Sequence, residues 1–348
     1  MALSGGHFAN LAEVLKATQP TLIPGVVDEN VKRGNPVDIL PFAQANHTGD
    51  SIQWLRETTT AEDDVVDLGI GGATVFTESS AFDVQSVTLK IAYIMRKLDK
   101  FNPAIHQTVN DYEEMMLNGM MRDLTKKLGD KLIYDNTVTN ALQMTGLHQL
   151  AQVNEDNSED FDIDGTQQAL SLESMRIVSD EMRNGYDFWF MSFILARRID
   201  RAYQEAGIVR LASGTAGALG LISYDADAQG RKVMLFDNHP IIRSDFMVAE
   251  DANSVTPNPR GKFTSGTRQY SIFAIKLGEA ALSEEDPGLK VAFGKTEGDG
   301  EFFNLDTFDK LEGFIAQALR LYSYTETILG SKFSLGRIFD VTDADVVF

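Results

Sequence analysis

The feature that most constrains the fold is a long helix predicted over residues 110–134. Asn110 followed three residues later by Glu113 is a helix-start pattern, and lysines gather toward the other end, where they complement the helix dipole. The helix spans roughly 36 Å if it continues to Tyr134 and about 27 Å if Gly129 ends it, and both lengths stay open. Either length is enough to cross a small domain.

One row of apolar side chains on this helix indicates how it packs. The row consists of Tyr112, Met116, Met120, Leu124 and Leu128. Because these residues are spaced by four, each step turns the row about 40° around the helix axis. The opposite side is polar. We therefore expect the helix to lie obliquely on a sheet, with its other side facing solvent or a neighbour.

The composition indicates a globular chain that buries a sizeable core. With 348 residues and 43% hydrophobic content, two or three compact regions are expected. No stretch approaches the 18 or so apolar residues of a membrane span, and the first residues lack the basic and apolar pattern of a secretory signal. The absence of cysteine excludes disulfides, thiolate metal sites and cysteine nucleophiles.

The charge balance limits the partners. The chain has 51 acidic and 31 basic residues and a net charge of −20. Such a surplus argues against reading or wrapping nucleic acid, because that affinity comes from Lys and Arg neutralising phosphates. It is compatible with a wall to which DNA does not adhere. It also fits a protein kept soluble in high salt, although Lys is not depleted.

Residues 1–45 are predicted to form an extended arm. Repeated prolines and glycines break any regular element there. The segment is nevertheless rich in Leu, Ile, Val and Phe, too apolar to remain in water. We expect the arm to lie on another surface.

A long hairpin follows the arm. Residues Ser51–Thr58 alternate as a strand, and the return strand has an apolar set that we expect to form its buried face. That set is Val87, Leu89, Ile91, Tyr93 and Met95. The connection, 59–82, is acidic and then glycine-rich, and a connection this long is functional or disordered. We interpret it as a projecting loop.

The rest of the chain mixes helices and strands. Helices are expected at Ser171–Asn184 and Ile194–Ala206, a strand at Phe188–Phe193, and a hairpin from Leu221–Tyr224 and Lys232–Phe236. Further strands are expected at Gln269–Leu277, Leu289–Phe293, Ile315–Tyr324 and Phe333–Val341, with a helical turn over Asp306–Phe314. No internal repeat is present.

Motifs for chemistry are incomplete. The run from Gly288 to Thr296 has five residues between its glycines, whereas a phosphate-binding loop has four. Asp160, Asp162 and Asp164 match only the first half of a calcium loop, so a solvated acidic loop is the preferred interpretation. The five histidines show no metal-binding spacing, and a dispersed pair of carboxylates cannot be recognised from spacing. We therefore assign no catalytic, cofactor or metal residue.

The order of elements resembles that of a known family. An apolar arm with the segment DILPF from Asp38 to Phe42 precedes WLRE from Trp54 to Glu57, which opens a long hairpin; a strand and a long helix follow. This order resembles the major capsid proteins of tailed viruses, which have the Hong Kong 97-type capsid fold. The resemblance covers essentially the whole chain.

The resemblance implies an α+β fold divided in a particular way. Residues 1–45 would be the N-arm and 46–85 the extended loop, a long β-hairpin. Residues 86–134 and 266–325 would be the peripheral domain, with the spine helix at 110–134. Residues 135–265 and 326–348 would be the axial domain.

The implied function is self-assembly into an icosahedral shell that encloses double-stranded DNA without sequence-specific binding. An arm and a loop that cannot bury their apolar residues within one subunit must bury them on neighbours, and repeated contacts between identical subunits close into rings and shells. The expected interface residues are Leu40, Phe42, Trp54, Arg56, Glu57, Val65, Val66, Leu68 and Ile70.

The partners implied by the resemblance are further copies of the chain, in hexamers and pentamers, and a portal. A separate scaffolding protein is expected, because the chain starts without the charged helical segment of members with a fused scaffold; a decoration protein is a further candidate. The protein would be assembled in the host cytoplasm, reside in the virion, need no membrane or cofactor, and have no enzymatic activity. Two alternatives stay open: an encapsulin-like nanocompartment shell, and an acidic soluble hydrolase.

Overall fold

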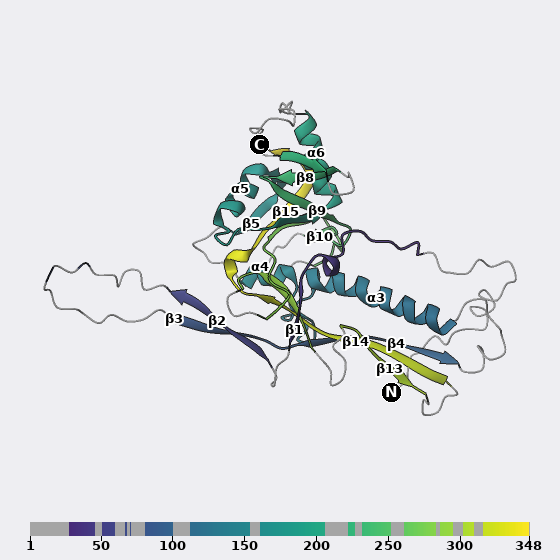
Figure 1. The fold of residues 1–348 in the computed structure, drawn as a ribbon. Helices are drawn as coiled ribbons and strands as arrows, with labels where there is room; N and C mark the ends of the chain where they lie inside the picture. The colour runs from purple at the N-terminus through teal and green to yellow at the C-terminus, as the bar shows by residue number, and fades with distance from the viewer. Residues whose placement is uncertain are drawn as a thin grey trace.

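The protein is an α+β chain built around two sheets and one long helix (Figure 1). The structure, a computed structural model, describes residues 28–45, 51–59, 67, 70, 81–99, 112–153, 161–205, 222–226, 232–251, 261–282, 286–294, 302–309 and 316–347. Within these ranges, none of the helices has the length and apolar character needed to cross a membrane.

The first sheet has five strands, in the order β1, β12, β14, β13, with β4 also paired to β14. The strands are β1 (Phe42–Ala45), β4 (Lys90–Asp99), β12 (Leu289–Gly294), β13 (Asn304–Phe308) and β14 (Ala316–Leu329). β1 is parallel to β12, and the other pairs are antiparallel.

Helix α3 (Tyr112–Tyr134) lies across this sheet and confirms the predicted long helix. It continues through Gly129, so the longer of the two predicted lengths is correct. The apolar row from Met116 to Leu128 is buried, together with Ala92, Leu98, Leu319 and Leu321 of the sheet. The four-residue spacing therefore identified the packing face.

The second sheet has eight strands, in the order β5, β15, β11, β6, β9, β8, β7, with β10 paired to β11. The strands are β5 (Asp162–Ser171), β6 (Phe188–Ser192), β7 (Ile222–Ala226), β8 (Lys232–Phe236), β9 (His239–Ser244), β10 (Glu250–Asp251), β11 (Arg268–Ile275) and β15 (Leu335–Val347).

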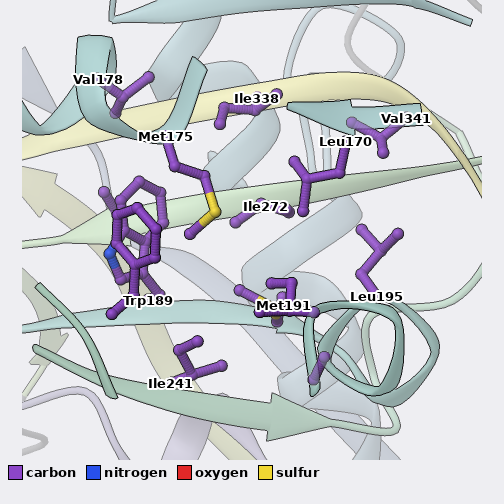
Figure 2. Close-up of a cluster of buried hydrophobic side chains, with 14 of the residues drawn as sticks. Leu170, Met175, Val178, Trp189, Met191, Leu195, Ile241, Ile272, Ile338 and Val341 are labelled. Atoms are coloured by element: carbon purple, nitrogen blue, oxygen red, sulfur yellow. The ribbon is translucent and has the colours of Figure 1, made fainter. Parts of the chain in front are cut away.

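Both faces of this sheet are covered. Helices α5 (Leu172–Glu181) and α6 (Phe193–Glu205) pack on the face that carries Trp189 and Met191 of β6 (Figure 2). The alternate residues of the same strand, Phe188 and Phe190, lie in the core on the other face. A strand buried on both faces has a continuous apolar sequence, which is why β6 was recognisable.

The last turns of α3 connect the two sheets. Leu132 and Ile133 do not belong to the core between α3 and the five-stranded sheet. They pack in the core under the eight-stranded sheet, beside Leu147 of helix α4 (Leu147–Val153). The same core contains Leu289 of the five-stranded sheet. One helix thus contributes to both hydrophobic cores.

A buried polar network reinforces this connection. The Glu250 carboxylate is fully buried; it accepts hydrogen bonds from the Tyr134 hydroxyl at 3.1 Å and the Ser271 hydroxyl at 2.5 Å. His148 Nε2 lies 3.1 Å from the same carboxylate, and Arg337 donates to the His148 carbonyl at 3.0 Å. Burial, followed by the negative charge of Glu250, raises the pKa of Tyr134, so this hydroxyl remains a donor. A buried carboxylate is tolerated only with such donors.

Several predicted elements differ from those observed. The helical turn expected over Asp306–Phe314 is wrong at its start, because Asn304–Phe308 is edge strand β13; residues 310–315 lie outside the described residues. α5 ends at Glu181, three residues before Asn184. The strands near 269, 289, 315 and 333 and the hairpin near 221–236 are confirmed.

Strand β5 contradicts the expected solvated acidic loop at its described residues. Asp162 accepts hydrogen bonds from Arg337 Nε at 2.6 Å and Nη2 at 2.5 Å, and both side chains are buried. The strand was missed because its sequence is polar and irregular, with positive φ at Thr166 and Gln167. The carboxylate of Asp162 therefore serves the chain's own fold, and Asp160 is outside the described residues.

The predicted division of the chain is wrong at β11 and at residues 326–329, which were grouped with 330–348 but are the end of β14 in the five-stranded sheet. Residues 266–325 were grouped with the long helix, but Arg268–Ile275 forms β11, which pairs with β6 and β15 inside the eight-stranded sheet. Its alternate residues fill the cores on both faces of that sheet, so it cannot belong to the five-stranded one. The strands of 289–325 do lie in the five-stranded sheet.

We predict opposite effects for two substitutions in α3. A Cβ at Gly129 would lie 2.2 Å from Asn35 Oδ1 and 2.9 Å from the Phe246 ring, whereas a Cβ at Gly119 would meet only Arg96 Nη1, at 3.5 Å. Gly129→Ala is expected to lower the free energy of unfolding by about 1–3 kcal/mol, because the crowding exceeds the gain in helix propensity.

Gly119→Ala, the matched control, is expected to raise the free energy of unfolding by up to about 1 kcal/mol. Urea denaturation of the unassembled subunit measures both. Equal effects of the two substitutions would contradict the described packing at Gly129.

Candidate assembly surfaces

The hairpin formed by β2 (Ile52–Thr59) and β3 (Ala81–Val87) stands away from both sheets as a two-stranded sheet of its own (Figure 1). The strands are antiparallel, with Leu55 opposite Val84 and Glu57 opposite Phe82. A hairpin was predicted here, but its return strand is β3, whereas most of the predicted return strand, residues 87–95, lies in β4, which pairs with β14 instead. An isolated hairpin is marginally stable in water, so this one needs a partner surface.

One face of the hairpin is apolar and exposed. Leu55 is 66% exposed, Phe82 63% and Val84 56%. Because directly opposite residues of an antiparallel pair share a face, these three side chains lie on the same side as Glu57. We call Leu55, Phe82 and Val84 the hairpin patch. Apolar side chains gathered in this way indicate an interaction surface.

The other face of the hairpin is attached to the subunit. Arg56 donates to the carbonyl of Leu329 at 3.0 Å and to that of Gly330 at 3.2 Å, where β14 ends. Burial lowers the pKa of Arg56, and the charge of Asp83 partly offsets this effect. Trp54, on the same face, is half-buried, and its Nε1 has no acceptor among the described residues. Arg56 thus anchors the base of the hairpin.

The arm residues behave differently from the expectation. Leu40 is only 5% exposed and lies in the core shared by α3 and α4, while Phe42 begins β1 and meets the Phe302 ring at 4.8 Å. The described part of the arm, residues 28–45, therefore buries Leu40 fully and Phe42 partly within its own subunit. The expectation that they must lie on a neighbour failed because β1 adds to the edge of the five-stranded sheet.

Polar contacts fasten the arm to both parts of the subunit. Lys126 of α3 donates to Asp28 at 2.7 Å, and the Asn35 side chain donates to the Thr125 carbonyl at 3.3 Å. On the other side, Ser244 of β9 donates to the Gly34 carbonyl at 2.6 Å. Residues 28–35 thus link α3 with the eight-stranded sheet.

The loop residues are only partly described. Ile70 is fully exposed, and Glu57 is exposed beside the hairpin patch. Val65, Val66 and Leu68 lie outside the described residues, and their assignment to an interface stays a prediction. Sequence reasoning named neither Phe82 nor Val84, although both follow from the alternation of β3.

A second exposed apolar surface lies on the five-stranded sheet and contradicts the predicted buried face of the return strand. In β4, Ile91 is 56% exposed, Tyr93 67% and Met95 42%, whereas Ala92 faces α3 and is buried. Alternation identifies two faces but does not tell which one the helix covers, since both carry apolar residues.

Aromatic residues of β14 extend this surface. Tyr93 is opposite Tyr322, Ile91 is opposite Tyr324, and Arg320 lies 5.3 Å from the Tyr322 ring. We call Ile91, Tyr93, Met95, Tyr322 and Tyr324 the sheet patch. Among the described elements, α3 is on the opposite side of this sheet.

A buried acid marks the junction near the Arg56 anchor. Glu326 of β14 is 2% exposed and accepts hydrogen bonds from the backbone N–H groups of Thr145 at 2.7 Å and Thr327 at 3.2 Å. Burial raises the pKa of Glu326, and the two hydrogen bonds only partly counteract it. The junction therefore holds a carboxyl group that binds its proton more tightly than an exposed glutamate does.

The chemistry available elsewhere is limited. A cavity of about 410 Å³ beside α6 is lined by one carboxylate, Asp200, whose partner is the Tyr224 hydroxyl, and by two arginines. A hydrolase working through paired carboxylates needs two of them facing a substrate. In the part of the chain that the structure describes, no cluster of three or more potential metal ligands occurs.

The comparisons with known proteins concern the fold. No protein-family model and no curated protein match the sequence. Among solved structures, the encapsulin in the holo-SrpI complex from Synechococcus elongatus has a TM-score of 0.65 at 10% identity, over 100% of this chain and 99% of that chain.

Viral and particle capsids share the same arrangement. The capsid of cyanophage A-1(L) has a TM-score of 0.62 at 12% identity, over 93% of this chain and 97% of that chain. The capsid of the native GTA particle has a TM-score of 0.54 at 12% identity, over 98% and 100%. The chain has the Hong Kong 97-type capsid fold, as the sequence predicted.

Loss of Arg56 is expected to loosen the hairpin. Arg56→Ala removes the hydrogen bonds to Leu329 and Gly330, each of the charged kind that contributes about 1.5–3 kcal/mol. Amide hydrogen exchange of 52–59 and 81–87 in the unassembled subunit should accelerate roughly tenfold or more. Glu57→Ala, the exposed neighbour, is the control. Equal exchange in Arg56→Ala and wild type would show that Arg56 does not anchor the hairpin.

The raised pKa of Glu326 predicts a specific pH dependence. Between the unfolded pKa of about 4.3 and the higher folded value, the folded state keeps a proton that the unfolded state releases, so stability falls as pH rises. Glu326→Gln keeps a side-chain oxygen that accepts the hydrogen bond from the Thr145 N–H. The substitution should remove the contribution of this carboxyl group to the pH dependence of stability.

The difference in unfolding free energy between wild type and Glu326→Gln, measured from pH 4 to 8, tests this. As pH rises, the unfolding free energy of Glu326→Gln should increase relative to that of the wild type. Glu57→Gln controls for the lost charge. A difference that does not vary with pH would contradict a buried acid at this position.

Proposed function

We propose that this chain is the structural subunit of an icosahedral capsid that encloses the double-stranded DNA genome of a tailed virus. The observation that carries the proposal is the hairpin patch, an apolar face on an element that projects from the subunit. The named structures that share the fold are shells, which supports a structural role with no catalytic activity of its own.

The positions of the two patches favour head-to-tail assembly. The hairpin extends from one side of the subunit, and β4, β13 and β14 extend toward the other side (Figure 1). A contact between two different surfaces generates rings when the rotation closes. The hairpin patch of one copy would then cover the sheet patch of the next.

The energy of such a contact favours large assemblies over dimers. Burying Leu55, Phe82 and Val84 contributes roughly 1.5–3 kcal/mol each, or about 5–9 kcal/mol together. Association costs about 4–15 kcal/mol in lost freedom. A single contact is therefore weak, and a closed shell, in which every copy makes several, is stable. Exposed ion pairs would add at most about 1 kcal/mol each.

Each segment of the chain has a role in the proposed capsid subunit. Residues 1–45 would be the N-arm and 46–85 the extended loop. The five-stranded sheet with α3 would be the peripheral domain, and the eight-stranded sheet, now including β11, most of the axial domain. Trp54 and Arg56 would hold the loop in place for assembly, and Glu57, Val65, Val66, Leu68 and Ile70 would contact the neighbour.

The partners follow from this role. Copies of the chain would form hexamers and pentamers, with a portal and a separate scaffolding protein, and a decoration protein is a further candidate. Assembly would take place in the host cytoplasm, and the product would be the virion. The net charge of −20 suits a wall that encloses DNA without binding it tightly.

An encapsulin-like nanocompartment is the second candidate, because the encapsulin structure matches the full length of the chain with a TM-score of 0.65. The same subunit contacts would serve both roles. The contents of particles from the native source separate them: double-stranded DNA supports the capsid, and a protein cargo supports the nanocompartment.

Charged substitutions in the hairpin patch test the proposal. Leu55→Asp and Val84→Asp each remove an apolar contact and place a carboxylate in it, so the concentration needed for assembly should rise roughly 100-fold or more. The subunit should stay folded, since both side chains are exposed.

Val138→Asp, at a position 75% exposed in the turn after α3, is the control for adding a carboxylate at an exposed valine. Light scattering and electron microscopy report assembly, and circular dichroism reports folding. Particles that form equally well from Leu55→Asp and wild type would overturn the role of the hairpin patch.

A further inference from the structure

The cavity beside α6 is not used by the assembly surfaces described above. Residues one turn apart on α6 form one wall, and strands β7, β8 and β9 form the other. The lining residues are Phe193, Ala196, Arg197, Asp200, Tyr224, Met234 and Arg243. The volume, about 410 Å³, is enough for one or two amino-acid side chains. Its lining is apolar at Phe193, Ala196 and Met234.

The arginines of the cavity differ from most others in the chain. Arg197 and Arg243 are exposed and have no carboxylate within ion-pair distance among the described residues. Arg198, the next residue along α6, is paired with Asp343 at 2.6 Å and Asp345 at 3.0 Å. In a chain with 51 acidic and 31 basic residues, two unpaired guanidinium groups at one cavity indicate a site for an anion.

The contacts of Phe193 and Asp200, which line the cavity, also favour an anion as the ligand. The Arg243 guanidinium lies 5.4 Å from the centre of the Phe193 ring, and Arg33 of the arm lies 4.2 Å from it. Arg33 is neutralised by Asp245 at 3.3 Å. Asp200, the acid of the wall, already accepts a hydrogen bond from Tyr224. The positive charge of Arg197 and Arg243 therefore remains available to a ligand.

We propose that this cavity binds an acidic peptide segment of a second copy of the chain, with an apolar side chain inserted against Phe193 and Met234 and carboxylates held by Arg197 and Arg243. The proposal rests on the proposed shell function, which brings copies together. It adds a contact distinct from the hairpin patch and the sheet patch.

Charge complementarity favours a second copy as the occupant. Each copy carries a net charge of −20, so neighbouring copies repel one another unless cationic sites receive acidic segments. The residues that line the cavity belong to α6 and to strands β7, β8 and β9. In Figure 1, α6, β8 and β9 lie at the far end of the subunit from the five-stranded sheet. Contacts there would hold together parts of neighbouring copies that the hairpin does not reach.

Cross-linking from the cavity tests the proposal. The chain contains no cysteine, so Met234→Cys provides a single thiol for benzophenone maleimide. Subunits grown with light and heavy nitrogen are mixed before assembly, irradiated and analysed by mass spectrometry. We expect mixed-isotope cross-links from position 234 to peptides rich in Asp and Glu.

Two charge variants in the same background define the specificity. Arg197→Glu with Arg243→Glu should reduce the mixed-isotope yield at least tenfold. Arg176→Glu with Lys127→Glu makes the same change of charge at exposed positions outside the cavity and should leave it nearly unchanged.

The outcomes separate this inference from the shell function. Closed particles with only same-isotope cross-links, or with a different protein cross-linked, would overturn the cavity contact and leave the shell intact. Absence of particles would overturn the shell function. In that case, mixed-isotope cross-links within a smaller oligomer would still support the cavity contact. The absence of such cross-links would refute it.

Discussion

The structure depends on the packing of one helix against two sheets. The first part of α3 buries Met116, Met120 and Leu124 on the five-stranded sheet, and its last turns bury Leu132 and Ile133 under the eight-stranded sheet. Because a helix of 23 residues is stiff and roughly 35 Å long, it fixes the two sheets relative to each other. The arm crosses α3 at Gly129, where there is no room for a side chain, and binds both parts. The network around Glu250 fixes the same junction.

This rigid body explains why the projecting hairpin can serve assembly. Arg56 fastens the base of the hairpin to the carbonyls where β14 ends, so the hairpin patch is held at a defined position while its apolar face stays in water. A floppy hairpin would lose conformational entropy on binding a neighbour, and a preorganised one loses less. The proposed assembly therefore combines a stable subunit interior with apolar surfaces that are buried only when copies meet. An acidic exterior is consistent with this, since it limits nonspecific association.

The sequence predicted the parts of the fold that depend on local pattern. The spacing of the apolar row identified α3 and its packing face, the continuous apolar run identified β6, and the order of elements indicated the fold. The features of the fold that depend on tertiary contacts were not predicted. Polar β5 is a strand because it pairs with β15, where Arg337 also binds Asp162, and β13 is a strand because it pairs with β14. The buried side of β4 was reversed because both faces are apolar, and Leu40 was placed on a neighbour because the pairing of β1 with β12 is not visible in the sequence. Of the residues that we propose for the interface, Trp54 and Arg56 at the hairpin base were predicted from the sequence, and Phe82 and Val84 were not.

The most direct test of the central claim is electron microscopy combined with light scattering on the purified chain, in low salt and in molar salt. The account predicts closed hollow particles, or rings that are their building units. Molar salt should preserve them, because apolar burial carries most of the association and salt screens the repulsion between acidic copies. A uniform monomer or dimer in both conditions, even with a scaffolding protein co-expressed, would contradict the claim that the exposed patches are assembly surfaces.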